Sequence, residues 1–120
     1  MTKLMRSNPS HIDYGDFKGL ILTNPNFVPS NIDGIVERNG KFLVMEWKRP
    51  NEKVSIGQQI LLKALSSKPG FTCVVINGNT DTTTEVNKFY KVTPVGCTYL
   101  GQGFDAFKEY LSLIHISEPT

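Results

Sequence analysis

The sequence predicts an α/β fold, bordering on α+β, in which helices flank a mixed β-sheet. Two apolar runs meet at Asn39-Gly40 as a hairpin, and a capped helical pattern separates this hairpin from the near-continuous apolar run 71–76. A strand, a helix and a second strand in this order make part of the sheet parallel. The 120 residues, 39% hydrophobic and 20% charged, suit one small domain. We expect this domain to span residues 1–110.

The hairpin is the clearest local signal. Asn-Gly between β-branched runs favours a two-residue turn, because both turn positions need a positive φ. The expected strands are 32–38 and 41–48. Before them, apolar residues recur between positions 12 and 22 and predict a short first helix.

The next helix begins after Ser55, a good N-cap, and Gln58 three residues later completes a capping box. Its expected apolar face consists of Ile56, Ile60, Leu61, Ala64 and Leu65. The uninterrupted run 71–76 is typical of a strand covered on both faces. A further strand is expected over 86–92, and a last helix near Gly103.

The final ten residues, 111–120, match the translation of a sequencing-library adapter of the transposase type. We therefore expect this tail to be an artefact, and the natural protein to continue differently after Tyr110. His115 is accordingly not considered as a ligand or base.

Composition excludes little. The formal net charge of +2 permits a polyanionic partner without arguing for one. The apolar runs are too short to span a bilayer, and the N-terminus has no apolar signal-peptide region. Cys73 and Cys97 form no C-x-x-C pair, which favours reduced thiols in an intracellular protein. The expected location is cytoplasmic, with no membrane association.

The hairpin register places two acids together. With a two-residue turn, Arg38 faces Lys41, so Asp33 faces Glu46 on the same side of the sheet. Two bare carboxylates with Cβ atoms about 4.5–5.5 Å apart repel each other, unless a cation lies between them. Lys48 projects from this face too. A divalent metal beside a lysine is typical of a hydrolytic site.

These residues resemble the PD-(D/E)xK nuclease superfamily. The resemblance is carried by Asn31-Ile-Asp-Gly34, by Glu46-Trp-Lys48 at hairpin spacing, and by Gly57-Gln58 at the head of the next helix. It covers residues 28–78, is most specific over 46–65, and is closest to small phage-borne members near the virus-type replication-repair nucleases and Holliday-junction resolvases. The resemblance implies a restriction-endonuclease-like core, a Mg²⁺- or Mn²⁺-dependent nuclease acting on DNA, and the host cytoplasm if the gene is phage-borne.

The resemblance also implies roles. Asp33, Glu46 and the main-chain carbonyl of Trp47 would hold the ion, because hard divalent cations take oxygen ligands. Lys48 would orient the attacking water and hold a phosphate oxygen. Gln58 would steady the water or a phosphate from the helix N-terminus.

Neighbouring residues give weaker indications. Arg49 and Lys53 flank this edge and could contact phosphates. Asp13 or Asp16 could supply the additional acid that the family often carries, and the sequence does not choose between them. It leaves open the DNA structure that is cut and whether two protomers pair as a homodimer to cut two strands.

Other interpretations remain open. Asp33 and Glu46 could be solvated acids with Lys48 as their salt-bridge partner, and Gln58 could serve only as a cap. Trp47 points away from the acids and is more typical of a core residue than of a base-stacking one. The competing function is a catalytically inactive nucleic-acid-binding or assembly module with the same fold.

Overall fold

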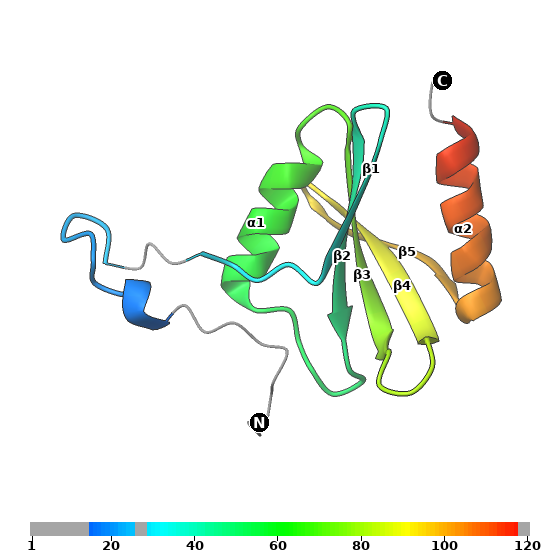
Figure 1. Ribbon diagram of the computed structural model, residues 1–120, viewed down its shortest axis with the longest axis horizontal. Helices are drawn as coiled ribbons and strands as arrows, with labels where there is room; N and C mark the ends of the chain where they lie inside the picture. The colour runs from blue at the N-terminus through cyan, green and yellow to red at the C-terminus, as the bar shows by residue number, and fades with distance from the viewer. Residues whose placement is uncertain (1–14, 26–28, 118–120) are drawn as a thin grey trace, which may run out of the picture. The chain divides into compact units, whose positions relative to one another are not determined.

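The computed structural model describes residues 15–25 and 29–117, with side chains to Ile114 (Figure 1). The chain separates into two compact units, 1–31 and 32–120. We describe each unit separately. No helix within the described residues is long and apolar enough to cross a membrane.

The first unit contains the 3-10 helix η1 (Gly15–Phe17) followed by turns. The helix expected over 12–22 is therefore wrong over its described part, and residues 12–14 lie outside that part. Gly19 has φ +83°, a conformation that ends a right-handed helix. Leu20 and Leu22 are exposed, so the apolar residues do not form a buried helical face.

The second unit is an α+β arrangement of one five-stranded sheet and two helices, in the order β1-β2-α1-β3-β4-β5-α2. The strands are β1 (Gly34–Arg38), β2 (Lys41–Lys48), β3 (Phe71–Asn79), β4 (Glu85–Thr93) and β5 (Gly96–Gln102); the helices are α1 (Ile56–Ser66) and α2 (Phe104–Ser117). Strand order follows the sequence. β2 and β3 are parallel, while the other neighbours are antiparallel. The predicted mixed sheet and crossover helix are thus confirmed.

The β1–β2 hairpin has the predicted register. Asn39 and Gly40 have φ 52° and 79°, as the two-residue turn requires. Arg38 pairs with Lys41, and the ladder continues to Gly34 opposite Met45. Asp33 lies one residue before this ladder, because β1 begins at Gly34 rather than at the expected residue 32, so the expected pairing of Asp33 with Glu46 is not part of the ladder.

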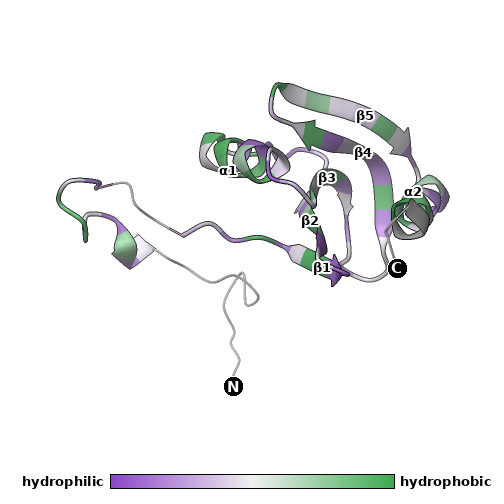
Figure 2. Cartoon of the chain, turned by 90° about the horizontal axis from the view of Figure 1, so that it is seen from above, coloured by the Kyte–Doolittle hydropathy of each residue, from purple (hydrophilic) through white to green (hydrophobic). Residues whose placement is uncertain are grey.

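The two helices cover opposite faces of the sheet (Figure 2). The cluster under α1 consists of Val44, Leu62, Cys73 and Val92. The cluster under α2 consists of Leu43, Val74, Ile76, Val86, Phe89 and Phe107. Successive residues of β3 alternate between these clusters, so the prediction of a strand covered on both faces is confirmed. Cys73 and Cys97 are both free thiols.

The helix α1 presents a different face from the predicted one. Leu62 is its buried residue, while Ile56 and Ile60 are 76% and 64% exposed. Gln58 and Leu65 share the side of Leu62, at the i, i+4 and i+7 positions of one helical face. The inward position of a polar residue, Gln58, thus accounts for the error in the predicted face.

The strand β5 was not anticipated, because Gly96 and Gly101 give its sequence little strand character. The predicted start of the last helix near Gly103 is confirmed by α2. Leu111 and Ile114 extend α2 and pack against the cluster beneath it. The adapter origin of residues 111–120 stays a prediction.

Two glycines allow the sheet and helix to be tested separately. A Cβ at Gly78 would lie 2.0 Å from the carbonyl oxygen of Glu85, where the β3–β4 register shifts. We expect Gly78→Ala to destabilise the fold by about 1–3 kcal/mol, as over-packing does. At Gly57, where a Cβ meets nothing within 4 Å, alanine should stabilise α1 by about 0.5–1 kcal/mol. Urea unfolding of both variants measures these changes, and equal effects would contradict the described β3–β4 packing.

Candidate active site at the end of β2

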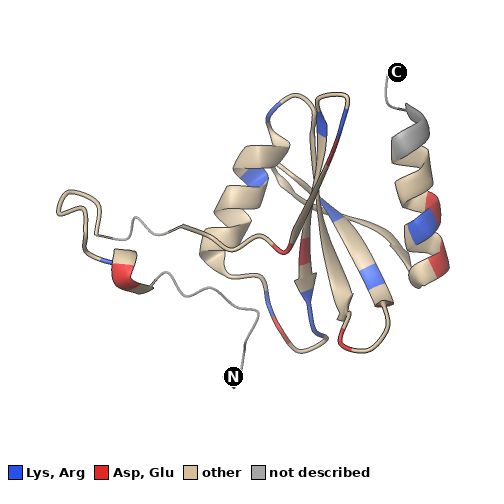
Figure 3. Ribbon diagram, in the orientation of Figure 1, with Lys and Arg blue, Asp and Glu red and all other residues tan. Residues whose placement is uncertain are grey.

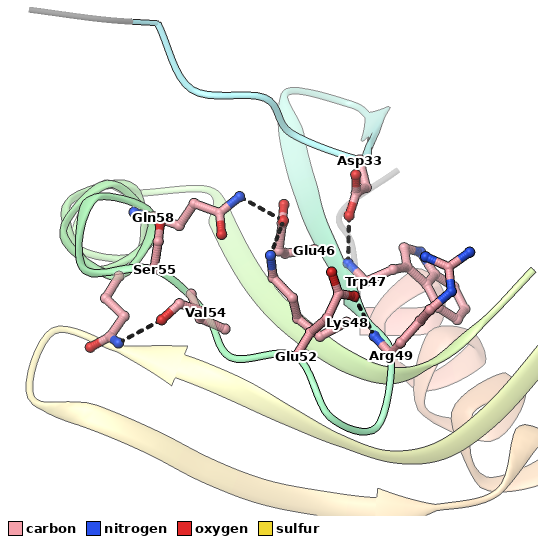
Figure 4. Close-up of polar contacts among 10 residues, drawn as sticks. Asp33, Glu46, Trp47, Lys48, Arg49, Glu52, Val54, Ser55 and Gln58 are labelled. Carbon is pink, nitrogen blue, oxygen red and sulfur yellow. Dashed lines mark hydrogen bonds and ion pairs between the residues drawn. The ribbon is translucent and has the colours of Figure 1, made fainter. Parts of the chain in front are cut away.

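The candidate site lies where β2 ends and α1 begins, at the carboxyl end of the parallel pair β2 and β3. In open sheets with parallel strands, ligands commonly bind at this end. Glu46 and Lys48 stand on the face of β2 that carries Val44, and α1 packs on that face. Gln58 reaches the site from the first turn of α1 (Figure 4).

Glu46 is the central residue. It is 4% exposed, and within the described part of the chain it is the one charged residue in the core. Gln58 Nε2 donates a hydrogen bond of 2.7 Å to Glu46 Oε2, and Lys48 Nζ lies 3.3 Å from the same oxygen. No hydrogen bond from the described residues reaches Oε1. Both described contacts of this buried carboxylate thus fall on one oxygen, Oε2.

The electrostatic balance at Glu46 follows from this burial. Loss of solvent raises the pKa of its carboxyl above the ordinary value, and the charge of Asp33 raises it further. Lys48 and Gln58 act in the opposite direction without cancelling the rise. Glu46 is therefore not the solvated surface acid of the competing interpretation, although Lys48 is its salt-bridge partner.

Asp33 is exposed and is held by the main chain of β2. Its Oδ2 accepts a hydrogen bond of 2.8 Å from the amide of Trp47. Figure 4 shows the Asp33 side chain directed at this amide, whereas Lys48 and Gln58 point toward Glu46. The charge of Asp33 acts on Glu46, but the sharing of one ion by the two carboxylates stays a prediction.

Local capping explains the position of Gln58. The Oγ of Ser55 accepts from the Gln58 amide at 3.2 Å, which confirms the predicted N-cap. The main-chain amide of Gln58 makes this capping bond, while its side chain extends to Glu46. Gln58 therefore does more than cap the helix. Gln59 instead donates to the carbonyl of Val54 at 2.9 Å.

Trp47 belongs to the opposite face. Its ring packs against the cluster beneath α2, in a T-shaped contact with Phe107 at 6.1 Å between centroids. The interpretation of the Trp47 side chain as a core residue is therefore confirmed. Its main-chain carbonyl remains the predicted third ligand.

The two predicted phosphate contacts differ. Arg49 is ion-paired with Asp81 of the β3–β4 loop, a partner that sequence reasoning missed because the two positions are far apart in the chain. The Arg49 amide also donates to Glu52. Lys53 is exposed in the loop between β2 and α1. Of the predicted additional acids, Asp16 lies in the first unit and Asp13 lies outside the described residues.

A further neighbour of Lys48 was also missed. Asn77 pairs with Lys48 across β2 and β3, and its side chain accepts a hydrogen bond from Asn87. The available signal was Asn77 itself, a polar residue directly after the apolar run 71–76. Side chains two residues apart lie on the same face of a strand, so Asn77 continues the face of β3 that borders the site.

Comparison with known proteins adds no relative. No family model, no curated protein and no solved structure matches this chain. Within the described residues, no three His, Cys, Asp or Glu side chains form a group able to hold a metal ion. The predicted ligand set has only two carboxylates, together with a main-chain carbonyl.

The raised pKa of Glu46 predicts a specific pH dependence. In metal-free buffer the folded protein retains the Glu46 proton to higher pH than the unfolded chain does. Stability is therefore lost as pH rises from about the ordinary value, 4.5, through the raised pKa. Glu46→Gln should lack this loss and retain a hydrogen-bonding side chain. Urea midpoints of both proteins between pH 4 and 8 measure the difference, and parallel curves would contradict the burial of a charged carboxylate.

Proposed function

We propose that this protein is a metal-dependent DNA phosphodiester hydrolase of the PD-(D/E)xK type, an endonuclease or a structure-specific nuclease. The observation that supports it best is the buried Glu46 carboxylate, paired with Lys48 and Gln58 and influenced by Asp33. We infer that β1, β2, α1 and β3 form the restriction-endonuclease-like core. All the motif residues come from this part of the chain.

The donor atoms suit a hard divalent cation. Glu46 Oε1 has no hydrogen bond from the described residues, and burial disfavours the charge of this carboxylate. A cation would give Oε1 a partner and would offset the cost of burying the negative charge. Asp33, Glu46 and the Trp47 carbonyl would therefore hold Mg²⁺ or Mn²⁺. The bound ion would lower the pKa of a water molecule and neutralise charge on the scissile phosphate.

The chain's own side chains would then position the reactants. Lys48 carries its ammonium beside Glu46 and is largely buried, so its interaction with a phosphate oxygen would be little screened by solvent. The Gln58 amide, at the N-terminal end of α1, would orient the attacking water. The main-chain N–H groups at this helix end favour an anion. Residues of β2 and α1 would thus approach one phosphate together.

A catalytically inactive nucleic-acid-binding or assembly module is the second candidate. Two contacts favour it: Lys48 is ion-paired with Glu46, and Asp33 accepts a hydrogen bond from the Trp47 amide. These contacts join both acids to the protein itself, so they would serve a non-catalytic module as well. Incubation of branched, single-stranded and duplex DNA with and without Mg²⁺ separates the two candidates, because only the nuclease produces Mg²⁺-dependent cleavage.

The acids are tested by conservative variants. Asp33→Asn and Glu46→Gln should each reduce Mg²⁺-dependent cleavage by at least about 100-fold, because each removes a charged oxygen donor. Asp105→Asn, at an exposed acid on α2, is the matched control and should cut at the wild-type rate. Gel assays of single-turnover cleavage measure all three, and wild-type rates in both site variants would exclude the proposed centre.

Lys48 should behave differently from the acids. Lys48→Ala is expected to keep divalent-ion binding while losing about 10²–10⁴ in cleavage rate, the usual effect of one positioned catalytic side chain. Lys48→Arg should restore little, because a planar fork does not replace a compact ammonium. Calorimetric Mn²⁺ titration and single-turnover cleavage of the same variants test this. Unchanged turnover in Lys48→Ala would leave only a salt-bridge role.

A further inference from the structure

The sheet register extends the candidate site across four strands. Lys48 on β2 pairs with Asn77 on β3, Asn77 pairs with Lys88 on β4, and Lys88 pairs with Gln102 on β5. Paired residues share one face of a sheet, so these four side chains form a single row, which we call the polar row. With strands about 4.8 Å apart, the row is about 14 Å long.

Two tyrosines lie beside the polar row on the same face. Glu46 pairs with Val75, Val75 with Tyr90, and Tyr90 with Tyr99. The tyrosine rings form a T-shaped contact with centroids 5.6 Å apart. Tyr99 is 54% exposed, and its hydroxyl lies 3.5 Å from Gln102 Oε1. An open aromatic ring is therefore held next to the row.

The covering helix leaves this part of the face accessible. α1 packs over Val44, Cys73 and Val92, which form the row beyond the one that holds the two tyrosines. Lys88, Tyr99 and Gln102 are all exposed. Lys88 forms no ion pair with the described residues. An exposed cation and an exposed aromatic ring thus lie on one sheet face, both beside Gln102.

We propose that a single-stranded DNA segment binds across this face, with phosphates at Lys48 and Lys88 and a base stacked on Tyr99. This inference rests on the proposed function, since the polar row begins at the proposed catalytic lysine. Aromatic side chains stack on any unpaired base, and lysines neutralise the backbone. In a duplex the faces of the bases are already stacked, so the ring at Tyr99 selects an unpaired segment.

The tyrosine is tested by binding without cleavage. Fluorescence anisotropy of a labelled twelve-nucleotide oligo-dT is measured with the full chain in EDTA. Tyr99→Ala should weaken binding by about 5- to 150-fold, the usual effect of losing one base-stacking side chain. Tyr99→Phe keeps the ring and should remain within about twofold of wild type. Unchanged affinity of Tyr99→Ala would overturn the proposal, as would a duplex of the same length that binds as tightly as the single strand.

The lysine has a matched control on its own strand. Lys91 is exposed on β4 but pairs with Val74, a residue of the cluster beneath α2, and so lies on the other face. Lys88→Ala should weaken oligo-dT binding and reduce the slope of log K against log salt by about 0.7. Lys91→Ala should leave the slope unchanged. Equal slopes for the two variants would overturn the proposal. Because Lys88 is exposed, Lys88→Ala should fold normally. The lysine test therefore remains valid even if Tyr99→Ala fails to fold.

The binding result is independent of catalysis. If the protein cuts no DNA with Mg²⁺ but the Tyr99 and Lys88 effects appear, the proposed nuclease function fails and the single-strand site stands. If it cuts DNA while both variants bind oligo-dT like wild type, the nuclease stands and the single-strand site fails.

Discussion

The contact on which the structure depends is the hydrogen bond between Gln58 and the buried carboxylate of Glu46. It joins the first turn of α1 to the end of β2, and a buried charge has few other means of satisfaction. Gln58 and Leu62 lie one turn apart on the same helical face, so this bond and the burial of Leu62 beside Val44 place the same side of α1 against the sheet. The rotation of the helix, the cluster beneath it and the candidate site are thus linked through this one face.

Part of the fold was predictable because its signals are local. Asn39-Gly40 determines the hairpin register through two positive φ values, and Ser55 determines where α1 begins. These features need no information from the rest of the chain. For the same reason the positions of Glu46 and Lys48 on one face of β2 could be deduced from the sequence alone.

Other features depend on distant contacts and could not be predicted. The face of α1 was misjudged because apolar spacing favoured Ile56 and Ile60, while the hydrogen bond to Glu46 favours the side of Gln58. The strand β5 has two glycines and weak propensity, and its pairing with β4 maintains it. The pairing of Arg49 with Asp81 joins two loops that no local pattern connects.

Both described contacts of Glu46 fall on one carboxylate oxygen, and this affects how the proposed site would bind a metal ion. Lys48 is a resident counter-ion there, so an incoming divalent ion would compete with an ammonium group for the same carboxylate. A bound phosphate would draw Lys48 away and ease this competition. By thermodynamic linkage each of the two ligands would then tighten the other by an equal factor. In the absence of nucleic acid, the ion pair of Lys48 with Glu46 would therefore weaken the binding of the metal ion.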